Sequence, residues 1–522
     1  MVWWRVVPPF APPRPRVRRL AVALAWAALT LLSACSTQPS RPNVILILTD
    51  DQLAASLALM PTLQRELVGE GVHLPNAFTS TPLCCPARVS LLRGQYAHNH
   101  RVRSNGGPEG GFPKLYDTGA EASSLATWLQ GAGYRTALMG KYLNAYPYGP
   151  EGENPSGYRG PRVNYVPPGW SEWYGFIDVP RDPRNSPYAM YDYKINANGR
   201  IRHYGSRPQD YQTDVLAGLA VDFVRRSARR GPFFLLLAPT APHLPAVPAP
   251  RHADAFRDLQ APRPPSFNAD PQGKARWLEL PPLSDADIAA IDATYRAQAQ
   301  MLLAVDELLG SLLDALRETG TLDNTYLVFT SDHGWHSGEH RLFHLKLTPY
   351  DASVRLPLVI RGPGIPKGEV REHLVLNTDL APTIAAWAGV SPPAWVDGRS
   401  LAPVLRPRPV PLEGWRQSVL TEFWPRRALG EDPEHRPTEH HPKVPVPQYR
   451  AVRTLGRLYV EYRYADGTRE GELYDLTNDP FELTNLYAGA DVALKAALAA
   501  HAEALQGCAG ATCRALEDQA VP

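Results

Sequence analysis

The chain has little cysteine, no excess charge of either sign and no long apolar run beyond its first residues. It has only five cysteines, and Cys84 and Cys85 are adjacent, which excludes a bridge between them because disulfide geometry requires facing Cβ atoms. Lys and Arg total 54 against 52 Asp and Glu. With no basic run interleaved with aromatic residues, we expect no nucleic-acid partner. The 522 residues, 44% hydrophobic, can instead bury a large core.

The N-terminal residues have the pattern of an export signal. The basic stretch "RPRVRRL" precedes the apolar run "AVALAWAALTLL" and the small residues "SACS", which match an n-region, an h-region and a cleavage site. The stretch "LLSAC", ending in Cys35, resembles a bacterial lipoprotein box. We therefore predict a signal peptide over 1–35, lipidation of Cys35 and a tether over 36–42. A plain signal peptide or an uncleaved anchor is the alternative.

This pattern predicts an exported protein, anchored by a lipid to a membrane of the cell envelope or periplasm. In such an oxidising compartment, Cys508 and Cys513 in "GCAGATCR" can close a small loop through a disulfide. Two free surface thiols are the alternative for this pair.

Apolar runs alternate with helical patterns over most of the chain. The runs "NVILILTDD", "YRTALMGK", "PFFLLLAPTAPH" and "TYLVFTSDHG" are typical of buried strands in a parallel sheet. The helical segments between them predict an α/β fold with a doubly wound, mostly parallel sheet sandwiched by helices. We assign this sheet to a catalytic domain over 43–400. Residues 401–522 predict a C-terminal subdomain with a small antiparallel sheet of two or three strands and a closing helix.

Polar side chains follow four of the predicted strands. Asp50 with Asp51, Lys141, His243, and Asp332 with His333 each stand where a strand ends. Taken singly, each has an ordinary explanation as a helix cap, a turn residue or a solvated charge. The carboxyl ends of the strands in an open α/β sheet form one ligand-binding edge. Three carboxylates there would repel one another unless a cation neutralised them, which predicts Ca²⁺ or Mg²⁺.

The stretch "CCPARVSLLRG" predicts a helix that begins at Cys84, with Pro86 in its first turn. A helix N-terminus favours anions and lowers the pKa of a thiol. Arg88 lies one turn further and can offer its planar guanidinium to an oxyanion. Together these features predict a metal, an activated residue and an anionic substrate.

Five motifs in order resemble those of the type I sulfatases, which depend on formylglycine. They are "RPNVILILTDDQ", "TPLCCPARVSLLRG", "GKYLN", "SDHGWHSGEHRL" and "ELYDLTNDPFELTNL". The doubled cysteine, "YAHNH" and "GKYLN" further resemble the N-acetylglucosamine-6-sulfatases and the heparan sulfate 6-O-sulfatases. The resemblance covers nearly all of the exported chain and implies an alkaline-phosphatase-like fold.

The resemblance implies that a formylglycine-generating enzyme oxidises Cys84 to Cα-formylglycine. Its hydrate is a geminal diol, in which one hydroxyl attacks the sulfur of a sulfate ester and the other later expels sulfate. Cys85 would then be a small buried packing residue. By the same resemblance, Asp50, Asp51, Asp332 and the modified Cys84 would hold Ca²⁺, with Mg²⁺ as the alternative.

The resemblance also implies roles for the cationic residues. Arg88 would steady the diol, Lys141 and Lys346 would neutralise charge on the sulfate, and His243 would contact the ester or assist the departing alcohol. Lys346 takes this role because the segment that follows it, "TPYDASVRLP", resembles the family segment.

Other polar residues leave more than one interpretation open. His333 stands where many members have asparagine, so it is a candidate metal ligand whose nitrogen suits Ca²⁺ less well. Many members carry a histidine where this chain has Leu143; either Asn144 replaces it by hydrogen bonding, or the role is vacant. His336 and His340 are candidate substrate contacts, with surface histidines as the alternative.

We therefore expect a sulfuric ester hydrolase acting on a sulfated small molecule or glycan, such as a sulfated sugar or a glycosaminoglycan. A phosphoester hydrolase or phosphoglycerol transferase of the same superfamily is one alternative. A non-catalytic lipoprotein that binds sulfated glycans through an unmodified site is the other.

Overall fold

The computed structural model describes residues 1–10, 41–147, 163–178, 186–425 and 444–521. The chain divides into two units, Met1–Ser40 and Arg41–Pro522. In the first, the described residues 1–10 are exposed and without regular secondary structure. Most of the predicted signal peptide, Cys35 and most of the tether lie outside the described residues, so these assignments stay predictions. Among the described residues, no helix has both the length and the apolar character needed to span a bilayer.

The four apolar runs form adjacent parallel strands at the centre of a ten-stranded sheet. Their order is β9 (Thr325–Ser331), β1 (Asn43–Thr49), β8 (Phe233–Ala238) and β4 (Arg135–Gly140). All seven residues of β1 are buried, as expected for a parallel strand covered on both faces. The predicted doubly wound sheet is confirmed.

Shorter strands extend the sheet on both sides. Beyond β9 lie β10 (Val359–Arg361), β2 (Val72–His73) and β11 (Glu369–Val370), and beyond β4 lie β5 (Glu172–Phe176), β6 (Tyr193–Ala197) and β7 (Arg200–Tyr204). Strands β10, β6 and β7 each pair antiparallel with their neighbours, so the sheet is mixed at its margins. A separate parallel pair joins β3 (Ala77–Phe78) to β12 (Val375–Leu376).

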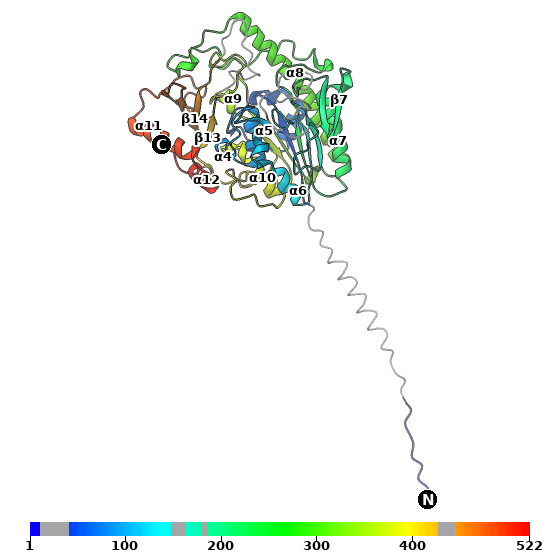
Figure 1. Ribbon diagram of the computed structural model, residues 1–522. Helices are drawn as coiled ribbons and strands as arrows, with labels where there is room; N and C mark the ends of the chain where they lie inside the picture. Colours follow the sequence, from blue (N-terminus) through cyan, green and yellow to red (C-terminus); the bar gives the residue numbers. More distant parts are fainter. Residues whose placement is uncertain (11–40, 148–162, 179–185, 426–443, 522) are drawn as a thin grey trace. The chain divides into compact units, whose positions relative to one another are not determined.

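Helices cover the two faces of the sheet because neighbouring side chains of a strand point to opposite faces. Val44, Leu46 and Leu48 of β1 pack with α3 (Cys84–Arg93), α6 (Leu125–Gly131) and α10 (Leu380–Trp387). Ile45 and Ile47 pack with α7 (Gln212–Ser227) and α8 (Asp285–Glu318). Figure 1 labels α8 in the upper part and α7 on the right of the folded part, and α6 and α10 along its lower part. Two apolar layers therefore enclose the sheet.

Short helices connect these elements. They are η1 (Ala54–Leu59), α2 (Pro61–Leu63), η2 (Gln64–Val68), α4 (Ala97–His100), α5 (Gly111–Asp117), η3 (Ala120–Ala122), η5 (Pro208–Asp210), η6 (Pro250–His252), η7 (Arg276–Leu278), η8 (Leu322–Asn324), α9 (Asp351–Val354), η9 (Asn377–Asp379) and η10 (Leu412–Gly414).

A second sheet of four antiparallel strands forms near the C-terminus. It contains β13 (Val419–Phe423), β14 (Gln448–Arg453), β15 (Arg457–Arg463) and β16 (Arg469–Asp475). The predicted antiparallel sheet is confirmed, but the expected number of strands was too low. Strand β13 is only five residues long, and it lacks the tight turn to β14 that would mark a hairpin in the sequence.

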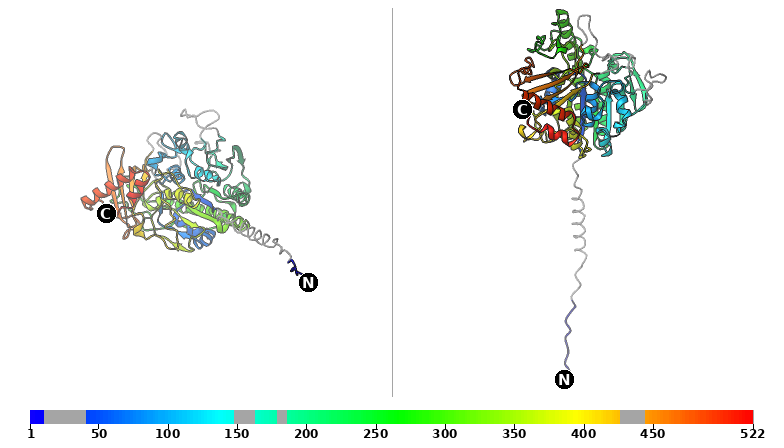
Figure 2. Two further views of the ribbon diagram at one scale, coloured as in Figure 1. Left: turned by 90° about the horizontal axis from the view of Figure 1, so that it is seen from below. Right: turned by 60° about the vertical axis from the view of Figure 1, so that its left-hand side comes forward.

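Two helices close this region, α11 (Val492–Gln506) and α12 (Ala511–Glu517). Helix α11 packs on β13 and β14 (Figures 1 and 2). Cys508 and Cys513, which lie between and within these helices, form a disulfide with an S–S distance of 1.97 Å. The structure thus pairs the two cysteines rather than leaving free thiols.

The small sheet packs on segments that lead to the large sheet's ligand-binding edge. Its side chains share one apolar cluster with Leu83, Leu345, Leu347 and Tyr350. Leu83 immediately precedes α3. The C-terminal residues therefore support the start of α3 and the loop after β9, and the domain boundary at residue 400 stays a prediction.

A buried ion-pair network joins the C-terminal helix α12 to η9, the short helix that contacts α3. Arg416 donates to both carboxylate oxygens of Asp379 at 2.6 and 2.8 Å and lies 3.0 Å from Glu517 of α12. The three side chains are fully buried. Asp379 belongs to η9, which contacts α3.

Substituting Arg416→Met should therefore destabilise the fold. The change leaves the buried Asp379 carboxylate without its side-chain cation and Glu517 with Arg399 alone, which should lower the free energy of unfolding by about 3 to 5 kcal/mol. Urea denaturation measures this loss. Arg225→Met is the matched control, because the Arg225–Glu318 pair is half-exposed and should contribute about 0 to 1 kcal/mol. Equal effects of the two substitutions would contradict the role given to Arg416.

Candidate active site

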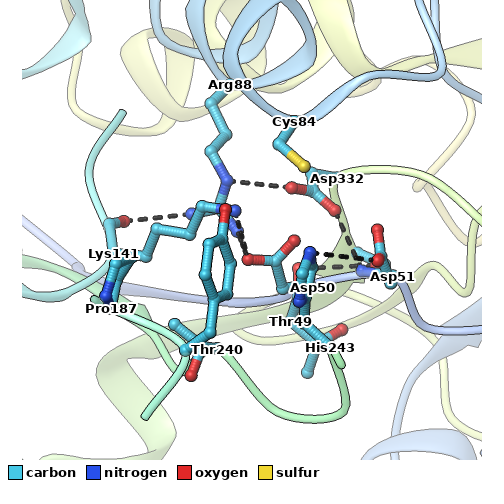
Figure 3. A network of polar contacts seen from close by, with 12 residues as sticks. Thr49, Asp50, Asp51, Cys84, Arg88, Lys141, Pro187, Thr240, His243 and Asp332 are labelled. Carbon is cyan, nitrogen blue, oxygen red and sulfur yellow. Dashed lines mark hydrogen bonds and ion pairs between the residues drawn. The ribbon is translucent and has the colours of Figure 1, made fainter. Parts of the chain in front are cut away.

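Three buried carboxylates meet at the carboxyl edge of the large sheet. Asp50 and Asp51 follow β1, and Asp332 follows the adjacent β9. The backbone of Asp51 has a φ of 61°, a left-handed conformation that is uncommon for a residue other than glycine. Its N–H donates to Asp332 Oδ1 at 3.3 Å. Figure 3 shows the three carboxylates around one space beside Cys84.

Three buried cations contact these carboxylates. Lys141, directly after β4, donates from Nζ to Asp50 Oδ2 at 2.5 Å. Lys346 donates to the two oxygens of Asp51 at 3.1 and 3.2 Å.

Arg88 lies between two of the carboxylates. Its Nε donates to Asp332 Oδ2 at 2.9 Å, and a terminal nitrogen lies 3.4 Å from Asp50 Oδ2. Its other terminal nitrogen donates to the Lys141 carbonyl at 3.0 Å (Figure 3). Arg88 therefore links α3 to the ends of β1, β4 and β9.

The positive charges determine the ionisation of Asp332. Burial opposes the charged carboxylate, but His333, Arg88 and both lysines outweigh burial and hold the pKa of Asp332 well below its usual value. Asp332 is therefore an anion across the physiological pH range.

Cys84 lies at the first turn of α3, beside this charge cluster. Leu83 before it is extended, so the helix N-terminus, with its partial positive charge, opens toward the carboxylates. The Sγ atom is fully buried, 3.2 Å from Lys346 Nζ and 3.4 Å from His333 Nε2. These contacts suit an anionic or strongly polarised group at position 84.

Cys85 has a different environment. It packs in the apolar cluster between the sheet and α3, and burial raises the pKa of its thiol to about 12. Its backbone N–H donates to the Asn105 side chain at 2.9 Å. The neighbouring thiol is thus a neutral packing group.

Two histidines point toward the carboxylates. His243 follows β8; its Nδ1 lies 2.5 Å from the Leu244 carbonyl, and its Nε2 lies 3.4 Å from Asp51 Oδ2. His333 Nδ1 lies 3.0 Å from the Gly334 carbonyl and 3.2 Å from Asp51 Oδ1.

The donor set fits a divalent cation. Potential ligand atoms of Asp50, Cys84, Asp332 and His333 lie within 4.8 Å of one another, as do those of Asp50, Asp51, Cys84 and His243. Within the described part of the chain, Asp50 Oδ1 is buried and has no hydrogen-bond partner, a costly state unless a cation binds it. Carboxylate oxygens are the ligands that Ca²⁺ and Mg²⁺ prefer.

The other predicted substrate contacts are Asn144, which lies near Lys141, and His336 and His340, which lie in the loop after β9. Asn144 donates from its amide to the Tyr188 hydroxyl at 2.9 Å, near Lys141. His336 is hydrogen-bonded to Thr348 at 2.7 Å, and the His340 ring packs on Tyr350. Both histidines are almost fully buried, so the alternative that they are surface residues is wrong. Both contacts lie within the loop after β9, and the Tyr350 hydroxyl of that loop donates to Glu472 of β16 at 2.7 Å.

Tyr188 is a site residue that the sequence did not reveal. It stacks on His243 and lies against Lys141. Its segment, "NSPYAMYDYK", has no motif, and an aromatic residue in such a loop carries no distinctive signal.

Comparison with known proteins identifies the family. A family model described as Sulfatase matches residues 42–390. A second model, described as N-sulphoglucosamine sulphohydrolase, C-terminal, matches residues 338–506. The chain belongs to the sulfatase family. It is a sulfuric ester hydrolase, and the resemblance seen in its motifs is confirmed.

Individual relatives support this assignment. The N-acetylglucosamine-6-sulfatase of Homo sapiens is 35% identical over 91% of this chain and 86% of its own length. The extracellular sulfatase SULF-1 homolog of Drosophila melanogaster is 38% identical over 76% of this chain, but the match spans only 34% of that relative. The fold, taken alone, is also that of a solved structure titled as a complex with its substrate, D-glucosamine-2-N,6-O-disulfate, with a TM-score of 0.70 at 24% identity over 89% of this chain and 97% of that one.

Substituting Asp332→Asn should weaken metal retention, because the carboxamide keeps the shape but removes a negative oxygen ligand. We expect the metal content of the purified protein, measured by elemental analysis, to fall by about 10-fold or more. Asp292→Asn is the control, since Asp292 is a buried carboxylate that binds Arg263 outside the cluster. Full metal occupancy in Asp332→Asn would show that Asp332 is not a ligand.

Proposed function

We propose that the protein is an exported sulfatase that removes sulfate from 6-O-sulfated amino sugars through a formylglycine made from Cys84. The observation that carries this proposal is the position of Cys84 at a helix N-terminus, with Lys346 and His333 in contact with its Sγ atom. Neither Cys84 nor Cys85 forms a disulfide, so a structural bridge does not account for a cysteine at position 84.

The Cys84 sulfur stands where the oxygens of a formylglycine hydrate would lie. That group supplies two hydroxyls, one to attack the sulfate ester and one to release sulfate afterwards. Lys346 contacts the sulfur at 3.2 Å and can therefore stabilise negative charge on an oxygen at this position. Arg88 is fixed by Asp332 and the Lys141 carbonyl, so it holds the first turn of α3 against the carboxylates.

Asp50, Asp51, Asp332 and residue 84 would hold the divalent cation, with His333 as a further candidate. When bound, the cation polarises the sulfate oxygens as a Lewis acid. Without it, the three carboxylates are balanced by Lys141, Lys346 and Arg88. The added charge would make the site positive, which suits a sulfate ester anion. The choice of Ca²⁺ over Mg²⁺ is part of this proposal.

Lys141 and His243 would act on the sulfate and on the departing alcohol. Lys141 Nζ, fixed on Asp50, supplies positive charge for a sulfate oxygen. His243 Nδ1 faces a backbone carbonyl, which leaves Nε2 directed toward the site. From there, Nε2 of the imidazolium form, in which both ring nitrogens carry a proton, can donate that proton to the ester oxygen as the S–O bond breaks.

The substrate class rests on the relatives. The human relative is named for N-acetylglucosamine 6-sulfate, and it matches this chain over most of both lengths. Export rests on the N-terminal pattern, on the name "extracellular sulfatase" of one relative and on the Cys508–Cys513 disulfide, since disulfides persist mainly in oxidising compartments. Lipidation of Cys35, membrane anchoring and maturation by a formylglycine-generating enzyme complete the proposal.

Cys84→Ala should abolish turnover, because alanine cannot become an aldehyde. We expect kcat for sulfate ester hydrolysis to fall by at least about 1,000-fold. Cys85→Ala is the matched control and should keep kcat within about 3-fold, because Cys85 only packs in the core. Comparable activity of the two variants would contradict the assignment of the nucleophile.

Mass spectrometry of the peptide containing residue 84 tests the modification itself. In protein purified from its native host, we expect an aldehyde at this position. An unmodified thiol on all molecules would favour the non-catalytic glycan-binding alternative.

A substrate panel should distinguish sulfate from phosphate chemistry. We expect sulfate release from N-acetylglucosamine 6-sulfate at a kcat/KM at least about 100-fold above phosphate release from N-acetylglucosamine 6-phosphate. Ion chromatography measures both products. Preferred phosphate release would instead support the phosphoester hydrolase alternative.

A further inference from the structure

Tyr188 contacts three residues of the candidate active site. Its ring stacks on the His243 imidazole, with centroids 4.0 Å apart and 18° between the ring planes. Lys141 Nζ lies 4.7 Å from the centroid of the same ring, within the range of a cation–π contact. The Asn144 amide donates to its hydroxyl at 2.9 Å. One side chain therefore connects the segments that follow β4 and β8.

Hydrogen bonds through Gln212 and Thr240 connect the backbone around Tyr188 to the segment that contains His243. Gln212, fully buried at the start of α7, donates to the carbonyls on either side of Tyr188 at 2.8 and 3.1 Å. The Thr240 hydroxyl donates to the side-chain Oε1 of Gln212 at 2.5 Å, and the His243 N–H donates to the Thr240 backbone carbonyl at 2.9 Å. The stacked rings thus lie on two segments joined by a buried hydrogen-bond chain.

This arrangement restricts the His243 imidazole. One ring nitrogen faces the Leu244 carbonyl at 2.5 Å, and the Tyr188 ring covers a face of the imidazole. Rotation of the imidazole would break both contacts. A displacement of about 1 Å of a reacting group can lower a rate by about 100-fold, so a fixed Nε2 matters for the chemistry.

We propose that Tyr188 is a positioning residue that holds His243 Nε2 toward the ester oxygen of the departing alcohol. This inference rests on the proposed function, in which His243 serves the leaving group. As an oxygen of the formylglycine hydrate forms a bond to sulfur, the bond between sulfur and the ester oxygen would break. Its electron pair stays on the ester oxygen, which takes a proton from Nε2 of the His243 imidazolium. The aromatic ring, rather than the hydroxyl, carries this role.

The test compares two aryl sulfates that differ in how much their leaving groups need a proton. The para-nitrophenolate ion leaves unaided, whereas phenolate benefits from protonation. For Tyr188→Leu we expect kcat on phenyl sulfate to fall by about 100-fold, and kcat on para-nitrophenyl sulfate by less than about 5-fold. Tyr188→Phe keeps the ring and should stay within about 3-fold of the wild type on both esters.

A double mutant shows whether Tyr188 acts through His243. His243→Ala should reproduce the selective loss, and adding Tyr188→Leu to it should change kcat on phenyl sulfate by less than about 2-fold. Tyr191→Leu is the matched control, a half-buried tyrosine of the same segment that packs on Tyr211 and should retain wild-type activity. Circular dichroism verifies folding, and Tyr188→Met replaces Tyr188→Leu if the latter does not fold.

Equal losses on the two esters, no loss, or fully additive effects in the double mutant would overturn the role of Tyr188. Failure of the wild-type, formylglycine-containing protein to release sulfate from N-acetylglucosamine 6-sulfate and from both aryl esters would overturn the proposed function, and this inference with it.

Discussion

Three carboxylates share one buried space at the edge of the large sheet, and the rest of the site depends on keeping them there. Buried anions repel one another and lose their hydration, so each must meet a positive charge. Lys141, Lys346 and Arg88 supply those charges from three different segments. These ion pairs therefore hold three segments at one place: the end of β4, the first turns of α3 and the loop after β9. They also place three positive charges where an anionic substrate would bind.

The small C-terminal sheet contributes to the site without supplying any of the residues predicted to react. Its apolar side chains pack with Leu83, immediately before Cys84, and with Leu345 and Leu347, on either side of Lys346. The buried Arg416 also binds Asp379 of η9, and η9 contacts α3, the helix that begins at Cys84. The second matched family region, residues 338–506, contains both the Lys346 segment and the small sheet.

Much of the fold and of the site could be predicted because they depend on residues that are close together in the sequence. Continuous apolar runs specify strands buried on both faces, and polar residues at their ends specify one sheet edge. The sequence did not reveal β13, which is short and distant in sequence from its partner strand. It also did not reveal the burial of His336 and His340, which pack on each other and on Tyr350 within the loop after β9. Tyr188 was missed for the same reason, since its role arises from a contact between segments far apart in sequence.

We propose that these carboxylates, together with residue 84, surround a divalent cation in the mature enzyme. Anomalous diffraction from crystals of the purified, active protein, grown with Mn²⁺ in place of the native ion, tests this claim most directly. The account predicts a single strong peak among Asp50, Asp51, Asp332 and residue 84, at about 2 to 2.6 Å from their oxygens. An active crystal with no peak there, and with Lys141 and Lys346 still balancing the carboxylates alone, would contradict it.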